Sequence, residues 1–264
     1  MDSRLLSLKK TIACCTLLIF SISGLAVAQP NAEKYKEPLA ALSSWFNGHD
    51  VNFAPLLDDQ RFEIYHEIGD KFRKSAERKS VDIDRYKIIL GFEQKRAQIR
   101  EFMNTHAEEL AKAEAEYDIP KYVISAIIGI ESDFGQNFGD YNPFNVYVSM
   151  YAVGYRQDFA RAQLKELLEF TERKNMDVFE LKSSYAGAMS AAQFIPYSVN
   201  KWWVGEDLWD MTNNIHSVAN YLAYFKKRTG SLEKAVLRYN PSSLYTRAVL
   251  DLAKEAEERI SAGQ

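Results

Sequence analysis

Cysteine is almost absent from this sequence, which excludes one common route to stability. The chain has only Cys14 and Cys15, which both lie within segment 1–28, so segment 29–264 contains no cysteine. If segment 1–28 is removed, the remaining chain cannot form a disulfide and must rely on a packed core. Its length is ample for one large domain or two small ones.

Long apolar runs are limited to the N-terminus, where the pattern is typical of a secretory signal peptide. Three basic residues precede an apolar stretch over residues 12–22, and the small residues Ala26-Val27-Ala28 follow. This order predicts cleavage after Ala28 and export to the periplasm. A transmembrane anchor is an alternative, but the stretch is short for a membrane span of about 20 apolar residues. A lipoprotein signal ending at Cys14 would leave almost no apolar segment before the cysteine.

An excess of basic residues is also missing. The whole chain carries a formal charge of −3, and removal of residues 1–28 takes away three basic residues and one acidic residue, which leaves about −5. The densest basic segment, residues 71–79, is interrupted by Glu77 and is typical of a solvated helix face. A nucleic-acid partner requires a clustered basic surface and is therefore not expected.

Motifs for several other chemistries are absent. The four histidines are scattered, with no His-Glu-x-x-His pair, and the chain contains neither a Gly-x-Ser-x-Gly nor a Gly-x-Gly-x-x-Gly sequence. The acidic stretch Gly205-Glu206-Asp207 does not fit the spacing of a twelve-residue calcium loop. We therefore expect neither a metal nor a cofactor.

Sequence signals for division into several domains are weak. No repeat, low-complexity tract or Gly/Ser linker divides residues 29–264, although residues 48–55 have the composition of a loop. We expect a single domain over 29–264, with an N-terminal helical extension at 29–98 and a main core at 99–264.

Apolar residues recur at helical spacing through most of this domain. A stripe of Phe102, His106, Leu110, Ala113 and Tyr117 predicts one helix from residue 99 to 117. Residues 122–130 are apolar around nearly the whole circumference, which predicts a buried helix. Further amphipathic helices are expected at 159–173, 216–228, 232–239 and 245–260. The best strand pattern is the alternation at 144–150, so the fold class is mainly α with at most a small β element.

One carboxylate is distinguished by its place in this pattern. Glu131 follows directly on the buried segment 122–130. There it faces the negative end of the helix dipole in apolar surroundings, and both effects should raise its pKa. A carboxylic acid that is neutral near pH 7 can act as a general acid on a glycosidic bond. A helix-end glutamate that points to solvent is the simpler interpretation of this local context.

Four sequence blocks extend the pattern around this residue. The first is Glu131-Ser132-Asp133-Phe134-Gly135, and the second is Ser-Tyr-Ala-Gly-Ala-Met-Ser-Ala-Ala-Gln-Phe-Ile-Pro at 184–196. The third combines residues 208–210 with 217–221, and the fourth is residues 238–245. In this order they resemble the membrane-bound lytic transglycosylase B family of the lysozyme-like superfamily. The blocks lie within about residues 118–250, roughly half of the chain.

The resemblance implies a lysozyme-like helical core at 99–264 and a peptidoglycan lytic transglycosylase. In that family a glutamate, here Glu131, protonates the oxygen between N-acetylmuramic acid and N-acetylglucosamine in the β-1,4 bond. It then accepts a proton from the muramoyl C6 hydroxyl, which attacks C1 and forms a 1,6-anhydro ring. This internal nucleophile removes the need for the second carboxyl group of ordinary glycosidases. Asp133 would be poorly placed for that role, since side chains two positions apart diverge on a helix.

Further residues carry over by position as substrate-binding or positioning groups. Ser184 is expected to hydrogen-bond Glu131, and the amides of Gln193 and Asn240 to reach the acetamido and oxocarbenium groups. Tyrosines are expected to line the sugar cleft, namely Tyr221, Tyr239, Tyr245 and, by spacing alone, Tyr86. Each of these residues has an alternative interpretation as an ordinary core or loop residue. The same holds for Trp202 and Trp203, which could stack on sugar rings.

Three departures from the family pattern concern the surroundings of this site. Ser190 stands where the family has glycine, which puts a backbone position with positive φ in question. The segment between Pro196 and Leu208 is too short for the calcium loop of some members. The segment between Tyr221 and Tyr239 is also short, so a lobe present in larger members is missing.

Two other functions stay open on the sequence alone. A muramidase or chitinase-like hydrolase would release a reducing end instead of an anhydro end. A catalytically weak, peptidoglycan-binding module of the cell envelope would need no acid, and the joint presence of Glu131, Ser184 and Asn240 argues against it. The expected partners are peptidoglycan glycan strands, bound by a monomer, and the sequence identifies no envelope protein as a partner.

Overall fold

The computed structural model describes residues 33–74 and 82–262, so the expected signal peptide at 1–28 lies outside the described residues. Every α-helix that the structure describes belongs to the compact unit Tyr35–Gln264. In the described ranges no helix combines the length and the apolar character that a membrane span needs.

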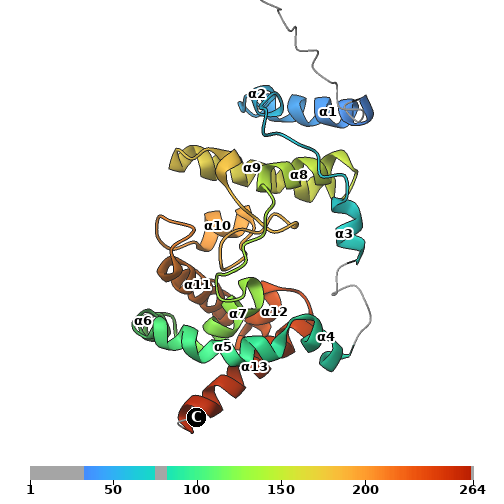
Figure 1. Ribbon diagram of the computed structural model, residues 1–264. Coiled ribbons are helices and arrows are strands. Elements are labelled where there is room, and N and C mark those ends of the chain that lie inside the picture. The colour runs from blue at the N-terminus through green and yellow to red at the C-terminus, as the bar shows by residue number, and fades with distance from the viewer. Residues whose placement is uncertain (1–32, 75–81, 263–264) are drawn as a thin grey trace, which may run out of the picture. The chain divides into compact units, whose positions relative to one another are not determined.

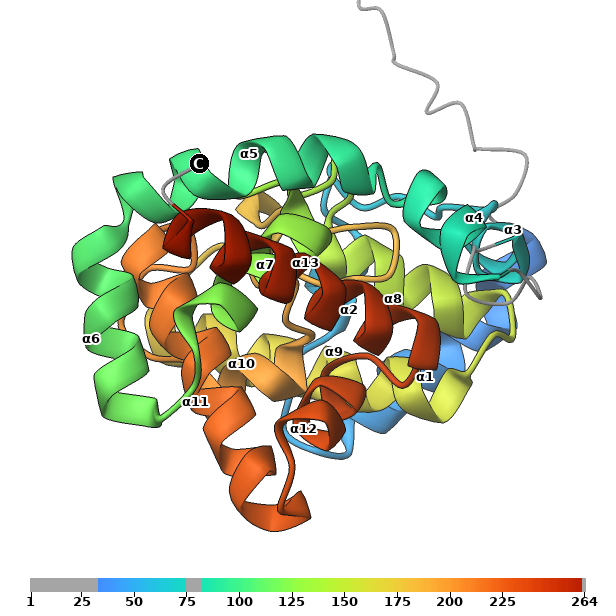
Figure 2. The same cartoon turned by 90° about the horizontal axis from the view of Figure 1, so that it is seen from below.

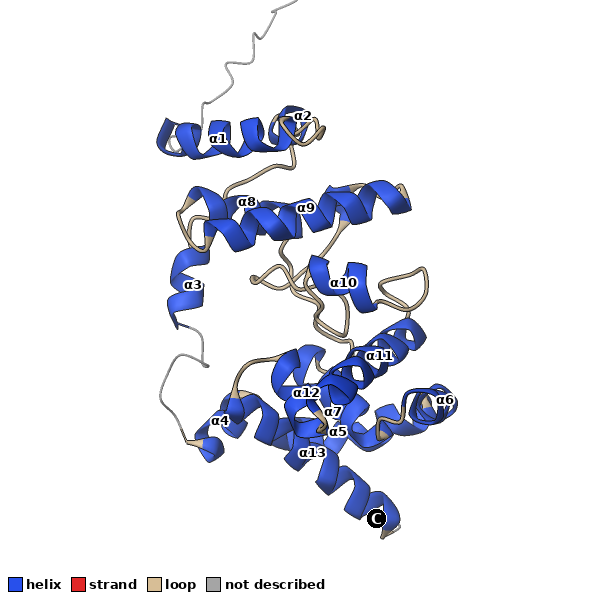
Figure 3. Ribbon diagram, turned by 180° about the vertical axis from the view of Figure 1, so that it is seen from behind, coloured by secondary structure: helices blue, strands red, loops and turns tan. Residues whose placement is uncertain are grey.

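Helices make up this unit, as the sequence predicts (Figure 3). After the 3-10 turn η1 (Glu33–Tyr35), they are α1 (Lys36–Asn47), α2 (Ala54–Leu57), α3 (Ile68–Lys74), α4 (Ile83–Ile89), α5 (Phe92–Thr105), α6 (Ala107–Tyr117), α7 (Lys121–Ser132), α8 (Pro143–Ala152), α9 (Gln157–Lys174), η3 (Val178–Glu180), α10 (Pro196–Trp202), α11 (Met211–Thr229), α12 (Leu232–Tyr239) and α13 (Ser243–Ser261). Isolated β-bridges join Tyr141 to Ser183 and Met189 to Phe194.

The helices form two groups (Figure 1). In one group α8 packs along α9, with α1 and α3 against α8 and α10 against α9. In the other group α7 packs against α5, α6, α11 and α13, and α12 lies against α11 and α13. Contacts between α10 and α11 join the groups. Viewed from below, α13 crosses α7 with α5 alongside (Figure 2).

The buried helix predicted at 122–130 is confirmed as α7. Eight of its twelve residues are buried, and Pro120 occupies its N-cap position. The amphipathic helices predicted further along the chain are also present, as α9, α11, α12 and α13. The bounds of α12 equal the predicted ones, whereas the ends of α9, α11 and α13 differ from them by one to five residues, since apolar spacing locates a helix better than its caps.

The strand predicted at 144–150 is wrong, because these residues belong to α8. Asn142 caps the helix by accepting a hydrogen bond from the Asn145 backbone N–H at 3.1 Å, and Pro143 fits the first turn. All ten residues of α8 are buried. A helix that is apolar on every side has no amphipathic period, so part of it can imitate strand alternation.

The single helix predicted over 99–117 is also wrong. His106 leaves the helical region (φ −112°, ψ 27°) and separates α5 from α6. Phe102 and Leu110 remain buried on either side of the break, so the apolar spacing continues across it. The expected division at residue 98 falls inside α5, and the separation of an extension at 29–98 from a core at 99–264 stays a prediction.

Candidate active site

Glu131 lies in the last turn of α7, at the end of the buried helix as expected. The chain then turns sharply, with Asp133 and Phe134 in the left-handed region at φ 50° and 59°. Each such non-glycine residue costs about 1 kcal/mol or more, so neighbouring contacts must hold the turn.

Phe134 holds this turn by folding back onto α7. A Cβ atom on Gly129 would lie 2.5 Å from Cζ of Phe134, so only glycine leaves room for the ring. The hydroxyl of Ser132 donates to the Ile128 carbonyl and accepts from the Gly135 N–H, both at 3.0 Å. The serine and the last glycine of the motif therefore shape the turn that presents Glu131.

An ion pair holds the other side of the same turn. Lys95 of α5 lies 2.5 Å from Oδ1 of Asp133, and the lysine side chain is only 7% exposed. An unpaired ammonium at such a depth is costly, which favours the paired position of Asp133. Asp133 is thus engaged with Lys95, and the expectation that it is not a second catalytic carboxylate stays a prediction.

Tyr245 connects the start of α13 to the candidate acid. Its hydroxyl donates to Oε1 of Glu131 at 2.6 Å, and the side chain is 2% exposed. Ser242 caps α13 by accepting a hydrogen bond from the Tyr245 N–H at 3.3 Å. Burial, followed by the negative charge of Glu131, raises the pKa of Tyr245 well above its usual 10.0. Its hydroxyl therefore stays protonated, and able to donate to Glu131, beyond the pH at which an ordinary tyrosine ionises.

Tyr239 ties the end of α12 to the loop that contains Gln193. Its hydroxyl donates to the Ala192 carbonyl at 2.6 Å, and its ring lies 5.6 Å from that of Phe194. Burial and then the charge of Glu131 raise the pKa of Tyr239, so this residue also experiences the field of the acid. Asn240 follows directly and ends α12, and its carbonyl accepts from the Ser242 N–H at 2.7 Å.

The two remaining tyrosines have the character of core residues. Tyr221 is 7% exposed and donates to the Arg238 carbonyl at 2.6 Å. Tyr86 of α4 is 1% exposed and lies near enough to Tyr245 to contribute to its raised pKa. Their contact with a sugar stays a prediction.

Ser184 and Gln193 lie on the compact segment between η3 and α10. The Ser184 N–H donates to the Ala188 carbonyl at 2.9 Å, and the Ser184 hydroxyl lies 3.5 Å from the same oxygen. The side-chain amide of Gln193 donates to the Ser190 carbonyl at 3.0 Å. Both polar groups serve turns of their own segment, and a bond from Ser184 to Glu131 stays a prediction.

Ser190 keeps the backbone geometry that the sequence puts in question. Its φ is 67°, a conformation that favours glycine, and the residue is completely buried. Its hydroxyl finds no hydrogen-bond partner within the described part of the chain. The turn is thus formed without glycine, at the expense of backbone strain and of an unsatisfied polar group.

Two buried polar residues that the sequence analysis did not single out brace this segment. Asn214 of α11 accepts from the Ala192 N–H at 2.9 Å and donates to the Leu208 and Asp210 carbonyls. Tyr147 of α8 donates to the Gly187 carbonyl at 2.9 Å. Polar side chains within apolar helix stretches are the signal that could have identified both, because buried polar groups are nearly always hydrogen-bonded.

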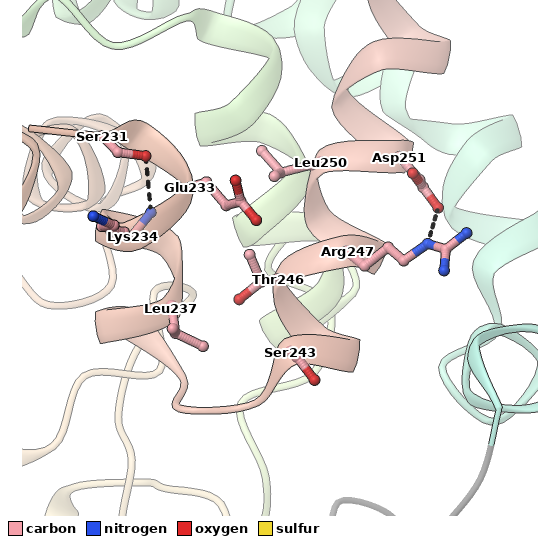
Figure 4. Close-up of a pocket in the computed structure, with 9 residues that line it drawn as sticks. All are labelled: Ser231, Glu233, Lys234, Leu237, Ser243, Thr246, Arg247, Leu250 and Asp251. Carbon is pink, nitrogen blue, oxygen red and sulfur yellow. Dashed lines mark hydrogen bonds and ion pairs between the residues drawn. The ribbon is translucent and has the colours of Figure 1, made fainter.

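A groove between α12 and α13 is formed by other residues (Figure 4). It is lined by Ser231, Glu233, Lys234, Leu237, Ser243, Thr246, Arg247, Leu250 and Asp251, none of which is a predicted site residue. Arg247 points toward Asp251, 3.9 Å away. Across residues 33–74 and 82–262, no three His, Cys, Asp or Glu side chains gather closely enough to hold a metal ion.

Comparison with known protein families identifies the chain. Residues 25–232 match the family described as the transglycosylase SLT domain. The chain belongs to this lytic transglycosylase family. Over 127 residues it is 31% identical to membrane-bound lytic murein transglycosylase B of Escherichia coli K12. That segment is 46% of this chain and 35% of the relative, so the match spans about a third of the relative's length.

Solved structures of lytic transglycosylases share the fold. Soluble lytic transglycosylase SltB1 of Pseudomonas aeruginosa is 23% identical with a TM-score of 0.73, over 86% of this chain and 100% of that one. SltB3 of the same organism, in complex with NAG-NAM-pentapeptide, is 19% identical with a TM-score of 0.74, over 84% and 79%. Escherichia coli Slt35 in complex with calcium is 18% identical with a TM-score of 0.69, over 90% and 95%. The mainly helical fold class is thereby confirmed.

Proposed function

We propose that this chain is a peptidoglycan lytic transglycosylase with Glu131 as its single catalytic acid and base. The hydrogen bond of 2.6 Å from Tyr245 to Glu131 carries the proposal, because it fixes one carboxylate at the end of a buried helix. Family membership supplies the reaction class, and SltB3, a relative by fold, binds a peptidoglycan fragment.

The proposed reaction needs one group that first donates and then accepts a proton. Glu131 protonates the oxygen between N-acetylmuramic acid and N-acetylglucosamine, and the bond from C1 to that oxygen breaks. The C6 hydroxyl of the muramoyl sugar then attacks C1 and loses its proton to Glu131. The new bond between O6 and C1 closes the 1,6-anhydro ring. Asp133, the nearest carboxyl group in sequence, is paired with Lys95, which supports a mechanism with one carboxylate.

The other predicted residues have supporting roles in this proposal. Tyr245 orients Glu131, while Tyr239 and Asn214 hold the segment that presents Ser184 and Gln193. Asn240 completes the proposed site toward the glycan, and the buried Tyr221 and Tyr86 support the site from the core. We also propose that residues 1–28 direct the protein to the periplasm, where its substrate is located, and that residues 29–264 act there as a monomer.

Mass spectrometry of the products released from purified sacculi tests the function. Wild-type protein should release 1,6-anhydro-muropeptides, and Glu131→Gln should release none while it unfolds at a similar temperature. Glu233→Gln, at an exposed position outside the site, is the matched control and should leave the products unchanged. Reducing muropeptides as the main product would replace the proposal with a muramidase-type hydrolase. A fully active Glu131→Gln variant would overturn the catalytic assignment.

A further inference from the structure

Three aromatic side chains reach the surface where α10 meets α11, away from the proposed catalytic residues. Tyr197 and Tyr224 are 40% and 41% exposed, which places them among the most exposed large apolar residues in the described ranges. The Trp202 ring lies near both, with its centroid 5.8 Å from Tyr197 at an interplanar angle of 78° and 5.5 Å from Tyr224 at 55°. We call these three residues the aromatic platform.

Contacts with residues of α11 hold Trp202 in place. The side-chain amide of Asn220 donates to the Trp202 carbonyl at 2.9 Å. The Trp202 ring also packs against Tyr221 at 4.8 Å and Phe225 at 5.3 Å. A ligand that stacks on such pre-placed rings loses little of its binding energy to ordering the protein.

A cation lies over one face of each of the two exposed tyrosine rings. Arg228 lies 5.1 Å from the centroid of Tyr224, and Lys201 lies 5.8 Å from that of Tyr197. Within the described part of the chain no carboxylate pairs with either one, whereas the nearby Lys226 pairs with Asp118 at 2.8 Å. On a chain with a net charge of −3, this is a local surface suited to an anionic ligand.

A row of rings connects the platform with the proposed site. Trp202 contacts Tyr221, and Tyr221 contacts Tyr239 at 4.9 Å. Tyr239 in turn experiences the charge of Glu131. The rings of Trp202, Tyr221 and Tyr239 therefore form a largely buried row that leads from the platform to the end of α12.

We propose that the aromatic platform is an accessory binding site for a peptidoglycan glycan strand. The rings of Tyr197, Trp202 and Tyr224 stack on the apolar faces of the sugars, and Lys201 and Arg228 meet carboxylates of the peptide stems. Apolar ring faces flanked by unpaired cations match a ligand that combines sugar rings with carboxylates. This inference rests on the proposed function for the identity of the glycan, and unchanged binding to sacculi after loss of the two tyrosines would leave a protein as the occupant of this surface.

Binding to purified sacculi tests the platform without interference from cleavage. In a Glu131→Gln background, the double substitution Tyr197→Ala and Tyr224→Ala should weaken sedimentation with sacculi about tenfold, as expected for two lost stacking contacts. Leu237→Ala is the matched control, because this side chain is also 40% exposed but lies on α12. Unchanged binding by the folded double variant would overturn the proposal, and so would a control that binds as weakly.

Tryptophan fluorescence provides an independent measurement should the double variant fail to fold. Soluble muropeptides should change the emission of the Glu131→Gln protein, and Trp202→Phe should abolish most of that change. Retention of the full change would contradict the assignment. Circular dichroism melts establish that each variant is folded.

A neutral glycan separates the role of the cations from that of the rings. Arg228→Ala should weaken binding to intact sacculi severalfold, with little effect on binding to oligomers of N-acetylglucosamine, whose sugars carry no carboxylate. Equal weakening on both ligands would contradict the role of Arg228.

The proposed function is judged separately, from the products of the wild-type protein. Absence of anhydro products with intact platform binding would refute the catalysis alone, while anhydro products with unchanged binding by the double variant would refute the platform alone.

Discussion

Tyr245 and Glu131, 114 residues apart in the sequence, are joined by a hydrogen bond of 2.6 Å. The carboxylate comes from the end of α7 and the hydroxyl from the first turn of α13. Because α13 also packs against α4, α5 and α12, the position of the candidate acid depends on the packing of the whole second group of helices. The site is therefore a product of tertiary structure, although its acid is found within a short motif.

Tyr245→Phe tests how far activity depends on the orientation of Glu131, because the variant keeps the carboxylate and loses the hydrogen bond that holds it. Loss of the hydroxyl removes a hydrogen bond to a partly buried carboxylate, so we expect the free energy of unfolding to fall by about 1–3 kcal/mol. A poorly held acid should also lower the initial rate on sacculi by about tenfold to a hundredfold.

Tyr239→Phe is the matched control for this substitution. It removes an equally short bond, to the Ala192 carbonyl, without removing a donor to Glu131. Its stability should fall by a similar amount, with a smaller loss of rate. If both variants lost rate in proportion to stability, Tyr245 would have no specific role in orienting the acid.

The position of Glu131 could be predicted from the sequence, but its partner could not. Composition alone makes residues 122–130 too apolar for a surface helix, and the motif begins where that segment ends. The direction of the Tyr245 hydroxyl depends on how α13 crosses α7, which no local pattern encodes. For the same reason, the bond of Ser184 within its own turn could not be foreseen, and its expected bond to Glu131 stays a prediction.

Gly129→Ala tests whether the turn after α7 depends on the close contact between Gly129 and the ring of Phe134. The new Cβ would lie 2.5 Å from the ring of Phe134, and buried surroundings leave the ring little room to move. We expect a loss of about 2 kcal/mol or more in the free energy of unfolding, together with reduced cleavage of sacculi. Chemical denaturation and product release measure the two effects.

Gly48→Ala is the control for the Gly129 substitution. Gly48 has φ −69° and its new Cβ would meet only ordinary contacts of 3.5 Å and 3.6 Å. This change should be neutral or slightly stabilising, because alanine restricts the unfolded chain more than glycine does. Equal effects of the two substitutions would show that the contact with Phe134 does not determine the turn.

Local patterns failed where burial is complete on all sides. In α8 the sequence offers alternation at 144–150, yet the Asn142 cap and Pro143 begin a helix. A cap depends on one or two residues, whereas periodicity averages over many, so the cap is easily missed in an apolar stretch. The left-handed residues Asp133 and Phe134 were equally unpredictable, since tertiary contacts hold a conformation that their own preferences oppose.

Ser190→Gly should stabilise the protein. Glycine adopts φ 67° without strain and removes a buried hydroxyl that has no partner in the described ranges. These gains exceed the larger entropy of glycine in the unfolded chain, so we expect about 1 kcal/mol of added stability. Ser190→Ala removes the hydroxyl but keeps the strain, and should gain less. A Ser190→Gly variant that unfolds at lower urea concentration than wild type would show that the hydroxyl has a favourable contact.

Alkaline pH should destabilise the fold through its buried tyrosines. Burial and the charge of Glu131 raise the pKa of Tyr239 and Tyr245 well above 10.0 in the folded protein. In the unfolded chain both titrate near 10, so above that pH the folded state binds more protons than the unfolded state. Their contribution to stability is therefore complete below pH 10 and is lost as the pH rises toward the folded values. The loss amounts to about 1.4 kcal/mol per pH unit for each tyrosine.

The Tyr239→Phe substitution should make the free energy of unfolding less dependent on pH above pH 10. Urea unfolding of wild type and Tyr239→Phe at several values between pH 8 and 11.5 measures the two slopes, and all other titrating groups are common to both proteins. Below pH 10 the difference in free energy of unfolding should be constant, and above it the difference should shrink by about 1.4 kcal/mol per pH unit as wild type loses stability faster. Parallel curves through pH 11.5 would mean that Tyr239 ionises alike in both states, and its burial beside the charge of Glu131 would then have to be reconsidered.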